Sequence, residues 1–189
     1  MSHRLAFVLF ALGYTTACGG GDGNDTPPQT IITMSGTVEI TGDNTASGGF
    51  STIGYTRRQS CAEYASLGSA PNDPGPVEAE GTFKIPGPTI GVPLEPSGDV
   101  YASTLRITPA IYQGPGTYAN DDATDQIDGQ IVLNEIPDGP AYFLEDGMAT
   151  ASINADGSGT VTFVDIPEDT TGLPTSISGT VTWTCSEDQ

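Results

Sequence analysis

Residues 177–185 are Ile-Ser-Gly-Thr-Val-Thr-Trp-Thr-Cys, and this stretch decides the fold class. Apolar or small residues at the odd positions alternate with Ser or Thr at the even positions. Successive side chains of a β-strand point to opposite faces, so the alternation predicts a strand with one buried and one solvated face. On this register Cys185 lies on the same face as Val181 and Trp183, which directs its thiol into the core.

The same period of two recurs on the N-terminal side of this stretch. The further strands that it predicts span residues 34–40, 50–57, 77–85, 101–107, 127–135, 142–144, 148–153 and 159–164. Turn residues separate them, as in Asn154-Ala-Asp-Gly-Ser158. We therefore expect an all-β domain, an antiparallel β-sandwich or barrel of about eight strands. At most one short helix is expected, at 61–67, ended by Gly68.

Three short segments resemble one another within this pattern. They are Ser35-Gly-Thr-Val38, Ser158-Gly-Thr-Val161 and Ser178-Gly-Thr-Val181. No fixed period separates them, so they do not predict a repeat array. The alternative interpretation is that Ser-Gly-Thr-Val favours the start of a strand after a turn.

Composition excludes several classes of function. The chain has 189 residues and a formal net charge of −19, with 5 Lys plus Arg against 24 Asp plus Glu. Nucleic-acid binding depends on Lys and Arg replacing phosphate counterions, and a polybasic membrane contact needs the same residues. We therefore expect neither a nucleic-acid partner nor a direct electrostatic contact with membranes.

The N-terminus has the pattern of an export signal. Arg4 precedes an apolar run at 5–12 that is too short to span a bilayer, which predicts a signal peptide over 1–17. Residues 18–30 are rich in Gly, Asp and Pro and are expected to form a flexible tether, because they cannot bury a core. A single β-domain is then expected over 31–189.

Thr15-Thr16-Ala17-Cys18 resembles the lipobox of bacterial lipoproteins, with Thr15 in place of the usual Leu. The resemblance implies cleavage before Cys18, lipidation of its thiol and a membrane contact through the lipid anchor only. It places the protein in the cell envelope. Gly19 instead of Asp implies the outer membrane or cell surface if the source is Gram-negative. The alternative is an ordinary secretory signal in which Cys18 is incidental.

The domain also carries motifs of small secreted lipoproteins. Residues 112–118, 154–161 and 179–185, together with the lipobox, are similar to uncharacterised small bacterial lipoproteins with a single secreted β-domain. The Thr-Cys ending with an upstream Cys is similar to the mycobacterial nineteen-kilodalton lipoprotein antigen type. The resemblance implies an exported β-domain with no established catalytic residues.

The cysteine and histidine counts limit the kinds of catalytic and metal-binding site that the chain can form. Outside the signal and Cys18 the chain keeps Cys61 and Cys185, and an even pair in an exported domain predicts a disulfide. Two free buried thiols are the alternative. The one His is His3, inside the signal peptide, so the mature chain has no histidine for a Ser-His-Asp or Cys-His nucleophile or a His-ligated metal site.

Acidic residues in 120–128 form a candidate calcium site. Asp121, Asp122, Asp125 and Asp128 supply oxygen ligands at short spacing, the donor type that Ca²⁺ prefers. The segment lacks the EF-hand pattern, and a solvated acidic loop is the alternative. No other metal or cofactor is expected.

Four further residues are candidates for ligand binding. Arg57 and Arg58 can capture a carboxylate or sulfate, or be neutralised by nearby acids. Tyr112 and Tyr118 can form a sugar-stacking face, or bury their rings in the core. We expect a non-enzymatic binding or surface-display module for an unidentified protein or glycan. A coat protein without ligand is the alternative, and a carboxylate-dependent hydrolase a weaker one.

Overall fold

A computed structural model describes residues 30–71, 73, 79–87, 93–99, 101–121, 123–133, 139–170 and 174–188. The predicted signal peptide at 1–17, Cys18, the tether up to residue 29 and Asp122 lie outside the described residues. Within the described ranges, no helix combines the length and hydropathy needed to cross a membrane.

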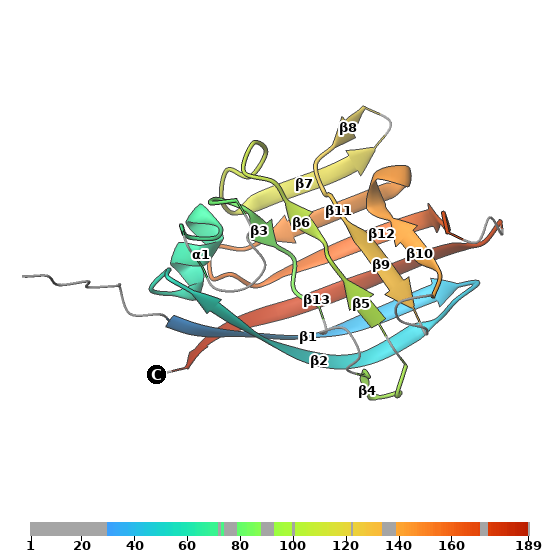
Figure 1. The fold of residues 1–189 in the computed structure, drawn as a ribbon, viewed down its shortest axis with the longest axis horizontal. Helices are drawn as coiled ribbons and strands as arrows, with labels where there is room; N and C mark the ends of the chain where they lie inside the picture. Colours follow the sequence, from blue (N-terminus) through green and yellow to red (C-terminus); the bar gives the residue numbers. More distant parts are fainter. Residues whose placement is uncertain are drawn as a thin grey trace, which may run out of the picture.

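An eight-stranded antiparallel sheet forms the larger layer of the domain (Figure 1). The first and last strands lie side by side in it, paired from Ile31 with Asp188 to Gly42 with Ile177. In spatial order the strands are β4 (Glu95–Pro96), β2 (Ala46–Thr56), β1 (Thr30–Gly42), β13 (Ser176–Asp188), β12 (Gly159–Pro167), β11 (Met148–Ile153), β7 (Gly116–Asp121) and β8 (Thr124–Asp125). The predicted all-β antiparallel fold is confirmed.

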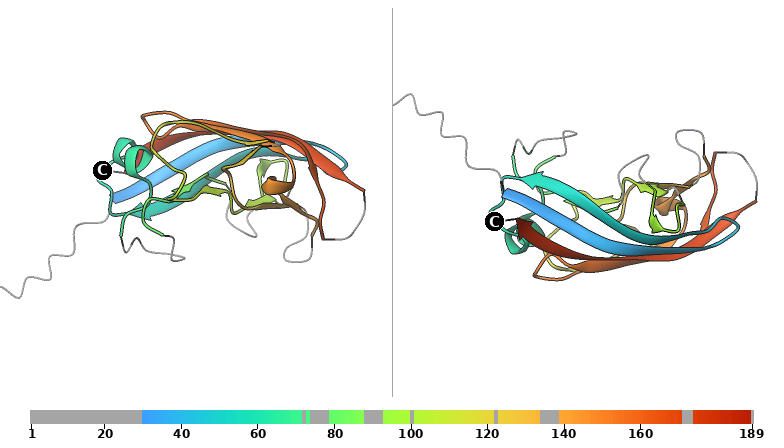
Figure 2. Two further views of the ribbon diagram at one scale, coloured as in Figure 1. Left: turned by 90° about the horizontal axis from the view of Figure 1, so that it is seen from above. Right: turned by 90° about the horizontal axis from the view of Figure 1, so that it is seen from below.

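Five short strands and a helix form a second layer. One small sheet has the order β10 (Ala141–Phe143), β9 (Gln130–Leu133), β5 (Tyr101–Ser103), and the other pairs β3 (Phe83–Lys84) with β6 (Arg106–Ile107). The views along the edge show these strands on the concave side of the large sheet and its convex side uncovered (Figure 2). The large sheet ends at β4 and β8 without closing, so the architecture is a sandwich and not a barrel.

The core lies between the two layers. Alternate residues of the large sheet point into it, among them Val38, Val181 and Phe163. Tyr101 and Tyr142 enter from the smaller layer and are fully buried. Burying one large apolar side chain contributes about 1.5–3 kcal/mol, so this shared core holds the two layers together.

Aromatic rings explain the three Ser-Gly-Thr-Val segments. Each glycine points inward opposite a ring on the neighbouring strand: Gly36 pairs with Phe50, Gly159 with Trp183 and Gly179 with Phe163. A Cβ at Gly36 or Gly179 would lie within 2.9 Å or 2.8 Å of the facing ring, too close for a side chain. Glycine in a strand interior marks such close approach. The repeated motif is therefore a packing device that recurs on β1, β12 and β13.

The predicted helix at 61–67 is α1 (Cys61–Leu67). Ser60 caps it by accepting a hydrogen bond from the Glu63 amide at 3.0 Å, and the Glu63 carboxylate accepts from the Gln59 amide. Gly68 ends the helix with φ 67°, a left-handed conformation that favours glycine.

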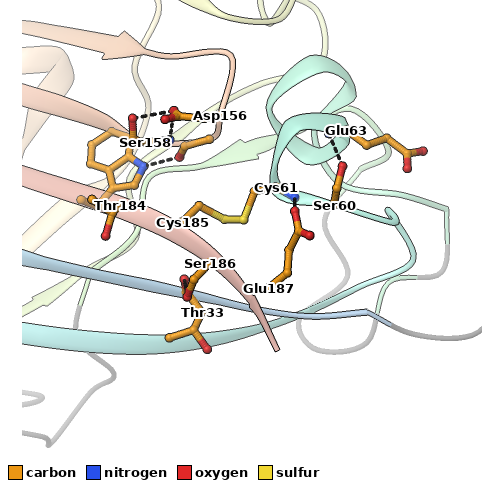
Figure 3. Close-up of a disulfide and its surroundings, with 12 residues drawn as sticks. Thr33, Ser60, Cys61, Glu63, Asp156, Ser158, Thr184, Cys185, Ser186 and Glu187 are labelled. Atoms are coloured by element: carbon orange, nitrogen blue, oxygen red, sulfur yellow. Dashed lines mark hydrogen bonds between the residues drawn. A yellow bond between two sulfur atoms is a disulfide. The ribbon is translucent and has the colours of Figure 1, made fainter. Parts of the chain in front are cut away.

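The predicted disulfide ties this helix to the last strand. Cys61 at the start of α1 is bonded to Cys185 on β13, with 5.9 Å between their Cα atoms (Figure 3). The Cys61 amide also donates to Glu187 Oε1 at 2.9 Å. Beside the bond, the buried Trp183 donates from Nε1 to Gly157 O at 2.8 Å. The inward direction expected for Cys185 thus brings its thiol to the helix.

Several strand boundaries differ from the expected ones. β2 begins at Ala46 and not at residue 50 as expected, because residues 46–49 pair with β1 and Gly48 and Gly49 also pair with β4; the turn after β1 covers only 43–45. Within 77–85 the described strand is only Phe83–Lys84. Glycine-rich sequence indicates turns locally, but sheet pairing extends these residues.

Candidate functional site

Two of the acidic candidates for calcium binding, Asp121 and Asp128, serve separate local roles. Asp121 Oδ1 accepts hydrogen bonds from the amides of Ala123 at 2.8 Å and Thr124 at 2.9 Å, and these bonds hold the pKa of Asp121 below its usual value. Asp128 Oδ2 instead lies 2.7 Å from Arg106 Nη2. Among the described residues, no three His, Cys, Asp or Glu side chains are grouped so that they can hold a metal ion.

Asn120, which precedes this acidic run, is a buried polar hub that the sequence did not indicate. Its Nδ2 donates to Ile127 O at 2.7 Å and Leu144 O at 3.0 Å. Its Oδ1 accepts from the amides of Gln126 and Ile127, both at 2.7 Å. These four bonds satisfy the amide and fix the chain between β7 and η1 (Leu144–Asp146).

The arginine candidates hold the chain around α1. Arg58 donates from Nε to Gly68 O and from Nη2 to Ser69 O, both at 2.9 Å, and so fixes the turn that leaves the helix. The Arg57 amide donates to Asp73 Oδ1 at 2.7 Å. Both side chains are half-buried. The Arg58 guanidinium thus donates hydrogen bonds to backbone carbonyl oxygens, which take the place of the oxygens of an anionic ligand.

The tyrosine candidates lie in the core. The rings of Tyr112 and Tyr118 stack with their centroids 5.5 Å apart, and Tyr112 also stacks on Phe83 at 5.1 Å. Tyr112 donates its hydroxyl to Ala65 O, and Tyr118 donates to Gly114 O. Burial raises the pKa of Tyr112, with the nearby Tyr118 adding to the shift. Neither ring presents a free face on which a sugar can stack.

The convex side of the large sheet is the one extended surface that the second layer leaves open (Figure 2). Its outward positions on β1, β13, β12 and β11 are half-buried or exposed, and most of them carry hydroxyl groups. We call this surface the hydroxyl face. Its Ser and Thr residues are Thr33, Ser35, Thr37, Thr41, Thr150, Ser152, Thr160, Thr162, Ser176, Ser178, Thr180, Thr182, Thr184 and Ser186.

Strand register places these hydroxyls in rows across the sheet. One row is formed by the cross-strand neighbours Thr37, Thr182, Thr160 and Ser152. Adjacent strands lie about 4.8 Å apart, and outward residues along one strand about 6.7 Å apart, which makes a two-dimensional lattice. Thr37 Oγ1 and Thr182 Oγ1 bond each other at 2.9 Å. At the end near the disulfide, Ser186 Oγ donates to Thr33 O at 3.3 Å (Figure 3).

The hydroxyl face is nearly free of charge in a strongly acidic chain. Among its outward residues on β1, β11, β12 and β13 whose side chains the structure describes, the charged ones are Glu39 and, at the bulge of β12, Asp165, and none is Lys, Arg or aromatic. Met148 and Val164 form an exposed, paired apolar edge. The described acids lie chiefly in turns, loops and sheet edges, such as Asp43 and Asp156. Its low number of carboxylates distinguishes the hydroxyl face from the turns and loops of the described surface.

The sequence contains the pattern that produces the hydroxyl face, although strand alternation alone did not identify the face. Each Ser-Gly-Thr-Val segment places Gly and Val inward and Ser or Thr outward, and Thr180, Thr182 and Thr184 follow at every second residue. The pattern gave the direction of each side chain. It did not show that β1, β12 and β13 are neighbours, which is what gathers the hydroxyls.

No protein-family model, curated protein or solved structure matches the chain. The function is therefore inferred from the chain's own residues: the N-terminal pattern, the disulfide and the hydroxyl face.

Proposed function

We propose that the chain is an exported, lipid-anchored envelope protein whose β-domain is a non-enzymatic binding module. The hydroxyl face is its binding surface. The observation that carries the binding role is an ordered, almost uncharged hydroxyl surface left open in a chain with a net charge of −19.

Three features of the chain support export and anchoring. The apolar run at 5–12 is of signal-peptide length, and Cys18 follows small residues as in a lipobox. The Cys61–Cys185 bond suits an oxidising compartment outside the cytosol. β1 begins at Thr30, at the end of the sandwich where α1 and the C-terminus lie (Figure 1). On this proposal the opposite end, with the β1–β2 turn, points away from the membrane.

Replacement of the lipidated residue tests the anchor. Cys18→Ala removes the only thiol that the lipobox pattern offers for acylation, so the protein should move from the membrane fraction to the soluble fraction of exported protein. The matched control is Cys61→Ala/Cys185→Ala, which keeps Cys18 and should remain with membranes if it folds. Retention of Cys18→Ala in membranes through detergent phase partitioning contradicts the anchor.

A coat protein without ligand is the second candidate. The hydrogen bond between Thr37 and Thr182 favours it, because hydroxyls that bond each other need a ligand less. The two candidates differ in one measurement: the binding module loses retention on its ligand when the face is changed, and the coat protein has no retention to lose.

A further inference from the structure

We propose that the hydroxyl face binds the surface of an uncharged polysaccharide, a neutral polymer that is itself covered with hydroxyls. This inference rests on the proposed function and names the ligand class for its binding surface.

The scarcity of charged side chains on the hydroxyl face favours an uncharged ligand. An anionic polymer is held by Lys and Arg, and the described outward positions of β1, β11, β12 and β13 have neither. On the described part of this face a cationic partner finds only Glu39 and, at the bulge of β12, Asp165, while exposed carboxylates such as Asp43 and Asp169 lie elsewhere. A neutral partner on this face avoids the desolvation of carboxylates that contact with the acidic turns and loops would require.

The chemistry of the face also disfavours a protein partner. The buried centres of protein interfaces are enriched in aromatic residues and Arg and depleted in Ser, and their affinity is concentrated in such anchors. The described hydroxyl face has no aromatic anchor, and its larger apolar residues stand at its ends, Met148 and Val164 at one and the half-buried Ile31 at the other. Its hydrogen-bonding groups are instead spread over four strands, with more of them on β1 and β13 than on β11 and β12.

The hydroxyls are held in place before a ligand arrives. Threonine is β-branched and restricted at χ1, and the strands fix the backbone, so little side-chain entropy is lost on binding. Each hydroxyl offers one donor and two acceptor lone pairs. The bond between Thr37 and Thr182 uses one donor and one lone pair, so both oxygens keep capacity for sugar hydroxyls. The threonine methyl groups between them can contact the C–H surfaces of sugar rings.

Anchoring makes weak individual contacts sufficient. Each neutral hydrogen bond contributes little net free energy in water, so one domain is expected to bind weakly. Several copies held on one membrane meet the same polymer at high effective concentration, which raises their combined affinity without new contacts.

The test is sedimentation of the full-length, detergent-solubilised protein with insoluble polysaccharides. Amorphous cellulose and curdlan are the neutral probes, and cross-linked polygalacturonate and chitosan the anionic and cationic ones. We expect retention on a neutral glucan that persists at about 0.5 M NaCl, where charge interactions are screened. The decisive variant is Thr37→Val/Thr160→Val/Thr182→Val, which keeps β-branching and removes one row of hydroxyls. It should lower retention about tenfold, since each bond lost is worth about two- to tenfold.

The matched control is Thr45→Val/Thr104→Val/Thr108→Val, which removes three hydroxyls from loops away from the face and should leave retention unchanged. Thr162→Glu is a second face variant that adds charge without adding apolar surface, and it should also lower retention. Circular dichroism establishes that each variant is folded.

Three outcomes overturn the inference: equal retention of wild type and face variants, retention only on a charged polymer that salt abolishes, and no retention on either glucan. Because detergent releases the protein from membranes, the assay does not depend on Cys18. Failure on glucans is therefore distinct from failure of the anchor, which the Cys18→Ala fractionation reports.

Discussion

Two buried tyrosines should respond in opposite directions to the same substitution. Tyr101 on β5 and Tyr142 on β10 are both fully buried. The Tyr142 hydroxyl accepts a hydrogen bond from Asn44 Nδ2. Among the described residues, the Tyr101 hydroxyl has no partner in hydrogen-bonding geometry, and neither does Ser103 Oγ on the same strand. Phenylalanine removes the hydroxyl in each case and keeps the ring.

The magnitudes follow from these environments. A buried polar group without a partner costs about 1–3 kcal/mol, so Tyr101→Phe removes that cost and leaves a small void. We expect its free energy of unfolding to rise by about 1 kcal/mol. Tyr142→Phe loses a satisfied hydrogen bond, so its free energy of unfolding should fall by about 1 kcal/mol. The two variants should therefore differ by about 2 kcal/mol.

Urea unfolding followed by the fluorescence of Trp183 measures both variants. Trp183 is buried and is the single tryptophan, so its emission reports the loss of the core. A change in midpoint with a constant slope on denaturant indicates a change in stability alone. If Tyr101→Phe is destabilised as much as Tyr142→Phe, the Tyr101 hydroxyl has a partner and the reasoning is refuted.

Alkaline pH provides an independent check on the same residue. Burial raises the pKa of Tyr101 from 10.0 to about 12, against a smaller lowering by the nearby Ser103 side chain, so the folded state keeps this proton after the unfolded chain has lost it. The corresponding stability is present below pH 10 and is lost as pH rises through 12, a change on the order of 3 kcal/mol. Tyr101→Phe should show a smaller decline than wild type over this range. An identical decline contradicts the assignment.

Three further predictions concern the contacts that hold the layers and turns. Replacing both Cys61 and Cys185 by Ser opens a link between residues 124 apart and should lower the free energy of unfolding by about 5 kcal/mol on the chain-entropy account; a loss under about 1 kcal/mol in chemical denaturation contradicts this. Asn120→Ala leaves two amide donors and two carbonyl acceptors without the side-chain amide that satisfies them. It should lower the free energy of unfolding by about 3 kcal/mol or more. A Tm within about 1 °C of wild type contradicts the role of Asn120 as a hub. The Arg106–Asp128 pair is about two-fifths exposed on both sides, so a double-mutant cycle with Arg106→Ala and Asp128→Asn should give a coupling below about 1 kcal/mol. A larger coupling shows that the pair is shielded from solvent.

The candidate site divides into what local sequence can and cannot predict. Alternation correctly assigned the inward Trp183 and Cys185, and Gly68 correctly marked the end of α1. The tyrosine and arginine candidates needed tertiary context: Tyr112 meets Phe83 from a distant strand, and Arg58 meets the carbonyls that follow α1. Composition showed that such groups exist, but not which neighbours satisfy them.

The sequence by itself determined the direction of each strand's side chains, the expected cysteine pair and the acidic charge, because period, count and charge are local properties. Only the tertiary structure decided that β1, β13, β12 and β11 are adjacent and that the smaller layer covers just one side of them (Figure 1). Pairing β1 with β13 joins the two ends of the domain, a long-range choice that depends on the whole core. This pairing brings threonines from separate alternating segments together into one continuous, nearly uncharged face.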